Sequence, residues 1–128
     1  MAKFDWKKFF NVGNHLAEFS DDEEYQRSAV RRYYYACFGL TTDYYESTHH
    51  VTIPTKESHN TLIKKLEDSC YDKENELGSL LKDLRRYRNS ADYYNTFDMR
   101  NVRNSQKQSQ DLIVLIEDLR KHPIVPKF

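Results

Sequence analysis

The stretch KENELGSLLKDLRRYRNSADYY, residues 73–94, decides the fold class, because its apolar residues recur at helical spacing. They fall at positions i, i+3, i+4 and i+7, which is the pattern of one buried stripe along a helix. The stripe consists of Leu77, Leu80, Leu81, Leu84, Tyr87, Ala91 and Tyr94. This stretch therefore predicts a helix that packs its leucine face against other helices.

Four further helices are expected on either side of this one. A face made of Trp6, phenylalanines and Phe19 predicts the first, and the aliphatic run DLIVLIEDL, followed by Pro123, predicts the last. Ser20 and Glu23 have the spacing of a capping box, so Ser20 is expected to open the second helix. The expected helices cover about residues 5–19, 20–45, 58–70 and 99–121.

The chain of 128 residues has the size of one domain, and no strand pattern interrupts the helices. Glycine and proline number only three each, which lets helices run long. We therefore predict a single all-α domain over residues 1–128, an up-down bundle of four or five helices. Residues 47–57 are expected to form a loop and residues 122–128 a short tail.

Composition excludes several classes of protein. Three scattered glycines cannot form a phosphate-binding loop, and Cys37 and Cys70 lie too far apart for a cysteine zinc motif. The chain has neither an apolar run long enough to span a membrane nor the start of a secretory signal. We therefore expect a cytoplasmic protein that needs no cofactor and no metal. His49 and His50 are read as exposed loop imidazoles rather than metal ligands.

The chain has no formal net charge, because 20 Lys and Arg balance 20 Asp and Glu. This excludes a protein that binds nucleic acid through an overall positive charge. A local basic patch stands out in LKDLRRYRNSADYY, residues 81–94, where cations alternate with tyrosines. Arginine forks bind phosphate oxygens, and tyrosine and arginine planes stack on unpaired bases. The candidate RNA- or phosphate-binding residues are Lys82, Arg85, Arg86 and Tyr94.

Arg88 is expected on or beside the apolar face, four residues after Leu84 and three before Ala91. A buried guanidinium without a partner is costly, so this position favours an ion pair, an interface or a bound anion. The structural alternative is an Arg88–Asp92 pair that only solvates the helix, and the local pattern alone favours that alternative.

Two segments resemble the HEPN superfamily of small helical domains. In the first, RSAVRRYYYACFGL at residues 27–40, the matching positions are Ser28, Arg32, Tyr34, Tyr35, Ala36 and Phe38. In the second, residues 81–94, they are Leu84, Arg88, Ala91, Asp92 and Tyr93. His59 also resembles a histidine that is common between these motifs.

The resemblance implies a helical bundle that forms a homodimer and acts on RNA or a nucleotide. Active members cleave RNA without a metal: an arginine holds the phosphate, and a histidine a few residues later activates or protonates ribose oxygens. Such proteins recur in toxin–antitoxin and anti-phage systems. The implied partners are a cognate antitoxin or a nucleotidyltransferase.

By this resemblance Arg88, Asn89 and Tyr93 are the expected catalytic residues, with His59 as a helper. Tyr93 stands where the family has its motif histidine. Three hypotheses therefore stay open: a ribonuclease, a non-catalytic module that binds RNA, nucleotide or a partner protein, and an interaction scaffold in which Arg88 only pairs across the dimer with an acid such as Asp92. The ribonuclease is placed slightly ahead on family grounds.

Overall fold

The computed structural model describes residues 3–124, and this part of the chain folds into five helices without a strand. The helices are α1 (Lys7–Phe19), α2 (Glu23–His49), α3 (Ser58–Glu67), α4 (Asp72–Tyr93) and α5 (Arg100–Lys121). They form a packed helical bundle, as the periodicity of the sequence predicts. No helix of the described part is long and apolar enough to cross a membrane.

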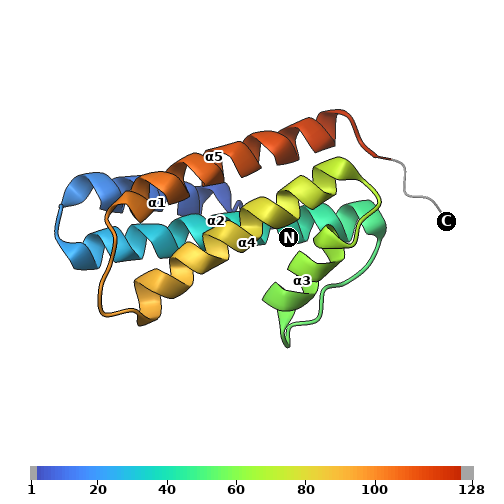
Figure 1. Cartoon of the computed structure of the whole chain (residues 1–128). Coiled ribbons are helices and arrows are strands. Elements are labelled where there is room, and N and C mark those ends of the chain that lie inside the picture. Colours follow the sequence, from blue (N-terminus) through green and yellow to red (C-terminus); the bar gives the residue numbers. More distant parts are fainter. Residues whose placement is uncertain (1–2, 125–128) are drawn as a thin grey trace.

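Helix α2 is the centre of the bundle, because α1, α4 and α5 all pack against it. In Figure 1, α4 runs in the opposite direction to α2 and α5, and the short α3 lies beside the first half of α4. This arrangement brings the 27–40 segment of α2 next to the second half of α4. The two segments that suggested a family resemblance therefore belong to packed neighbours.

Tyrosine supplies much of the core that a chain poor in aliphatic residues lacks. Tyr33, Tyr34 and Tyr44 of α2 are fully or almost fully buried: Tyr34 and Tyr44 lie among leucines of the other helices, and Tyr33 packs against Phe10 and Gly13 of α1. Each hydroxyl has a partner: Asn14 Oδ1 at 2.7 Å, His59 Nδ1 at 2.5 Å and Glu74 Oε2 at 2.8 Å, respectively. Buried hydroxyls that are paired in this way avoid the cost of lost hydration.

Helices α1 and α2 approach each other closely at Gly39. A Cβ atom placed on Gly39 would lie 2.2 Å from the ring of Trp6, well inside contact distance. Only glycine allows the indole to rest on the α2 backbone here. Phe19, which the sequence placed on the same apolar face of α1, is instead 63% exposed.

The second helix begins and ends later than the sequence predicted. Ser20 is not part of a capping box: its Oγ accepts the amide of Asp22 at 3.0 Å, and the helix begins only at Glu23. The other end reaches His49, so the loop covers residues 50–57 and not 47–57. His49 is anchored to Glu74 on α4, and His50 then adopts a left-handed conformation with φ of 55°. A contact from a distant helix thus adds the last turn.

The remaining boundaries differ by a few residues. Helix α3 ends at Glu67 rather than near residue 70, because Asn75 of α4 bonds the carbonyl groups of Leu66, Glu67 and Ser69 at the following turn. Helices α1, α4 and α5 match the predicted ranges to within two residues. Of the predicted tail, residues 125–128 lie outside the described part of the chain.

Candidate functional site

Arg88 lies inward, as its position in the apolar pattern predicts. Its side chain is only 11% exposed, and its guanidinium lies 5.4 Å and 5.6 Å from the ring centroids of Tyr34 and Tyr35 on α2. One amino group, Nη1, donates to Asp92 Oδ2 at 3.2 Å. The aromatic faces and the carboxylate together hold the charge of Arg88 at the boundary between α2 and α4.

The carboxylate of Asp92 is shared between two arginines. Its other oxygen lies 3.1 Å from Nε of Arg31 on α2, and the Asp92 side chain is 15% exposed. Burial acts to lower the pKa of Arg88, but the hydrogen bond to Asp92 and the charges around it raise that pKa on balance. Arg88 is therefore charged at every physiological pH.

Two guanidinium groups at this site keep a buried N–H without a partner. Nε of Arg88 and Nε of Arg85 are both inaccessible to solvent and make no hydrogen bond within residues 3–124. The Nη1 group of Arg85 donates to Asn60 at the start of α3. An unpaired buried donor on a cation is costly, and an anion bound nearby would offset that cost electrostatically.

His59, in the first turn of α3, belongs to the same cluster. Its Nδ1 lies 2.5 Å from the hydroxyl of Tyr34, and its ring stacks on Phe38 with the centroids 4.1 Å apart. Burial lowers the pKa of His59 below its ordinary value, and the positive charges of Arg85 and Arg88 lower it further. The imidazole is thus neutral near pH 7.

Tyr34 connects the histidine to the arginine. Its ring faces the guanidinium of Arg88, and its hydroxyl contacts His59. Burial raises the pKa of Tyr34 far above its ordinary value, although both Arg85 and Arg88 act to lower it. Tyr34 therefore keeps its proton, and with one ring nitrogen of His59 engaged, only Nε2 remains for a ligand.

The other predicted site residues lie at different distances from this cluster. Asn89 is half-buried on α4 beside Arg88. Lys82 and Arg86 are exposed and pair with Glu67 at 3.6 Å and with Asp83 at 3.4 Å. Both of these are exposed ion pairs, which bind weakly and remain open to a competing phosphate.

Tyr93 and Tyr94 lie at the exposed end of α4. Their side chains are 73% and 61% exposed, and within the described residues neither makes a side-chain hydrogen bond or a ring contact. The backbone of Tyr94 accepts a hydrogen bond from Arg27 at 2.8 Å. The structure therefore brings His59, and not Tyr93, to the arginine.

Two residues of the site, Arg31 and Asn60, were missed by sequence reasoning. Tyr34 and Tyr35 were recognised only as part of a motif. The signal for Arg31 lies in its position beside Arg32 and Tyr35 in the α2 motif, but the pairing with Asp92 depends on how α2 and α4 are aligned. No local pattern reveals that alignment.

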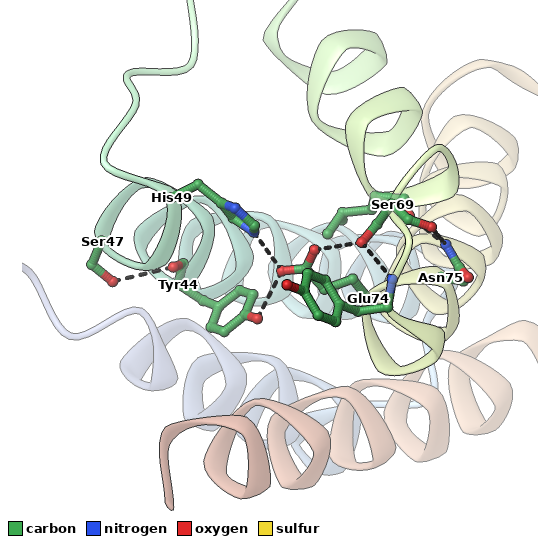
Figure 2. Close-up of polar contacts among 8 residues, drawn as sticks. Tyr44, Ser47, His49, Ser69, Glu74 and Asn75 are labelled. Atoms are coloured by element: carbon green, nitrogen blue, oxygen red, sulfur yellow. Dashed lines mark hydrogen bonds and ion pairs between the residues drawn. The ribbon is translucent and has the colours of Figure 1, made fainter. Parts of the chain in front are cut away.

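A second polar cluster surrounds Glu74, which is completely buried at the start of α4. As Figure 2 shows, Oε2 of Glu74 accepts hydrogen bonds from Tyr44 at 2.8 Å and His49 at 2.7 Å, while Oε1 accepts one from Ser69 at 2.7 Å. His49 is thus half-buried and paired, so its interpretation as an exposed loop imidazole was wrong. His50 is exposed, as expected.

A pocket of about 580 Å³ lies beside the Glu74 cluster. Both carboxylate oxygens of Glu74 accept hydrogen bonds from donors on α2 and in the α3–α4 turn. These bonds link α2, the α3–α4 turn and α4. In the described part of the chain, no group of three or more His, Cys, Asp or Glu side chains is arranged to hold a metal ion. The cluster therefore acts as a structural tie, and the Arg88 site is the stronger candidate for function.

Comparison with known proteins gives no match to a family model, a curated protein or a solved structure.

Proposed function

We propose that this chain binds single-stranded RNA at the Arg88 site and cleaves it without a metal ion, in the manner of the HEPN ribonucleases it resembles. The observation that carries the proposal is the half-buried guanidinium of Arg88, whose buried Nε–H is unpaired and which shares Tyr34 with a neutral histidine. An anion-binding group and a proton acceptor thus meet at one tyrosine.

Arg88 would bind the scissile phosphate. The rings of Tyr34 and Tyr35 and the carboxylate of Asp92 fix its orientation before any ligand arrives. A guanidinium held in a site of low exposure stabilises the charge that develops on the phosphoryl oxygens more strongly than one in water does. Arg85 adds a second positive charge from one turn earlier on α4.

His59 would act as the base. Its lowered pKa keeps the imidazole neutral, and with Nδ1–H donating to the hydroxyl oxygen of Tyr34, the free lone pair of Nε2 takes the proton of a ribose 2′-hydroxyl. The 2′-oxygen then attacks phosphorus and the bond to the 5′-oxygen of the next nucleotide breaks. That oxygen takes a proton from water, a 2′,3′-cyclic phosphate remains, and His59 returns its proton to the solvent. Tyr34 holds Nδ1, which fixes the direction of the imidazole.

Exposed groups near the site suit an unpaired strand. Lys82 and Arg86 lie on the solvent side of α4, and Tyr93 and Tyr94 present open rings at its end. Cations follow a phosphate backbone, and bases stack on tyrosine rings without regard to sequence. These features support a single strand as the substrate in preference to a duplex.

The HEPN resemblance also carries the assembly part of the proposal. It implies a homodimer in a toxin–antitoxin or anti-phage system, with a cognate antitoxin or a nucleotidyltransferase as partner. Sedimentation of the purified chain tests the dimer directly: a monomer at micromolar concentration would remove this part of the proposal.

The second candidate is a module that binds RNA without cleaving it. Its support is Tyr93, which stands in the place of the family's motif histidine and is 73% exposed. If His59 cannot replace that histidine, the arginines still bind phosphate but no base acts on the ribose.

One experiment tests the proposal and separates the two candidates. A labelled single-stranded RNA is incubated with the purified chain in EDTA, and both binding and product ends are measured. Fragments ending in 2′,3′-cyclic phosphate support the ribonuclease. Binding without fragments supports the module. Absence of any RNA binding at low salt would overturn both.

A further inference from the structure

A pocket of about 260 Å³ lies on the outer face of α2, next to the Arg88 site. Four of its lining residues, Ser28, Arg31, Arg32 and Tyr35, have the spacing i, i+3, i+4 and i+7, so they form one stripe along the helix. Leu16 of α1 closes the other side. The proposed function makes no use of this pocket.

The pocket offers donors and positive charge but no lining carboxylate. The guanidinium of Arg32 lies 5.0 Å from the ring centroid of Phe9, and no acidic side chain pairs with it within residues 3–124. Arg31 uses only its Nε for Asp92, which leaves both of its terminal amino groups. The hydroxyl of Ser28 has no hydrogen-bond partner in the same part of the chain.

Two residues join this pocket to the Arg88 site. Tyr35 lines the pocket, and its ring also contacts the guanidinium of Arg88 at 5.6 Å. Asp92 lies between the two arginines, 3.1 Å from Arg31 and 3.2 Å from Arg88. An anion bound in the pocket would therefore be a close neighbour of an anion bound at Arg88.

We propose that the Ser28–Arg31–Arg32–Tyr35 pocket binds a second phosphate group of the same ligand. Two guanidinium forks and two hydroxyls supply more donors than the two oxygens of a carboxylate can use, whereas they match the oxygens of a phosphate. The ligand then carries neighbouring phosphates, as an RNA strand or a nucleoside polyphosphate does. The choice of RNA rests on the proposed function, while the anion pocket rests on its own geometry.

Arg32 is the residue that tests the pocket, because it contacts neither Asp92 nor Arg88 and its loss leaves the first site intact. We compare Arg32→Gln, Arg32→Lys and the control Arg120→Gln, an exposed arginine near the end of α5. Fluorescence anisotropy with a labelled oligouridine over a series of NaCl concentrations gives the affinity and its salt dependence. Circular dichroism checks that each variant is folded.

The expected result is specific to the charge and shape of the group removed. Arg32→Gln should weaken binding about tenfold and reduce the slope of log K against log salt by about 0.7, the value for one phosphate contact on a single strand. Arg32→Lys should keep the slope but lose part of the affinity, since lysine lacks the planar guanidinium that donates two parallel hydrogen bonds to a phosphate. Arg120→Gln should change neither quantity.

Competition with ATP and inorganic pyrophosphate distinguishes the two sources of phosphate. Suppose that Arg32→Gln binds RNA, ATP and pyrophosphate as the parent does, while Arg88→Gln binds RNA less well. The assignment of a phosphate to the Ser28–Arg31–Arg32–Tyr35 pocket is then wrong, and the proposed function stands. If the parent binds ATP or pyrophosphate through Arg32 but no RNA, the pocket stands and the proposed function fails. Absence of all binding overturns both.

Discussion

The hydroxyl of Tyr34 lies 2.5 Å from Nδ1 of His59, and this contact joins α2 to the first turn of α3. The ring of the same tyrosine lies under the guanidinium of Arg88 from α4. One fully buried tyrosine thus determines how a histidine and an arginine from different helices are placed relative to each other. The predictions below test this arrangement and the packing around it.

Tyr34→Phe should separate the orienting role of Tyr34 from its packing role. Phenylalanine keeps a ring beneath Arg88 but removes the partner of His59 Nδ1, so we expect a loss of about 1 kcal/mol in the free energy of unfolding. RNA affinity should change little, while the rate of cleavage should fall and its pH profile should shift, because the imidazole loses its fixed direction. Denaturant unfolding and single-turnover kinetics measure these effects. Loss of affinity with an unchanged rate would contradict this role.

Protonation of His59 should destabilise the fold. Because its folded pKa is lowered below the ordinary value of 6.5, the unfolded chain binds the proton more readily. The contribution of His59 to stability is therefore complete above about pH 6.5 and is lost as the pH falls through the folded pKa. As the pH is lowered from 7.5, the free energy of unfolding measured in urea should fall in the parent, and it should fall less in His59→Gln. Parallel curves for parent and variant would contradict the prediction.

Glu74→Gln should lower stability, because it leaves a buried amide where His49, Tyr44 and Ser69 all donate to a carboxylate. We expect a loss of about 2–3 kcal/mol, which is typical of a buried charge-assisted network. Glu76→Gln, at an exposed position on the same helix, is the matched control and should change stability by less than about 0.5 kcal/mol. Equal unfolding midpoints for the two variants would show that the network contributes nothing.

Gly39→Ala should destabilise the contact between α1 and α2 by about 1–3 kcal/mol, because the new Cβ would meet the indole of Trp6. Adding Trp6→Ala removes the obstacle, so the double variant should lose less than the sum of the two single variants. A double-mutant cycle from denaturant unfolding measures this coupling. Additive losses would mean that the two residues do not touch.

The sequence predicted the number of helices and most of their lengths because each carries its own apolar period. It also predicted that Arg88 lies inward, since that follows from the residues around it on one helix. The C-terminal end of α2 was missed because His49 is held by Glu74, a residue 25 positions away. Helix ends that depend on tertiary contacts leave no local signal.

The candidate site was predicted only in the part that one helix contains. Arg85 and Arg88 were singled out from the pattern of α4 alone, whereas Asn89 and His59 were named from resemblance. The contacts of His59 with Tyr34 and of Asp92 with Arg31 depend on how three helices are aligned, which spacing along the chain does not specify. Tyr93 was assigned from its place in a motif, yet it lies near the end of α4, where its ring faces solvent.

The most direct test of the central claim is the rate of single-stranded RNA cleavage in EDTA by Arg88→Gln and by the charge-matched control Arg120→Gln. The account predicts that Arg120→Gln cleaves at the parent rate. Arg88→Gln should lose about 100-fold or more, as removal of a charge-stabilising donor does in enzymes, while remaining folded by circular dichroism. Equal cleavage by a folded Arg88→Gln and the parent would contradict the account.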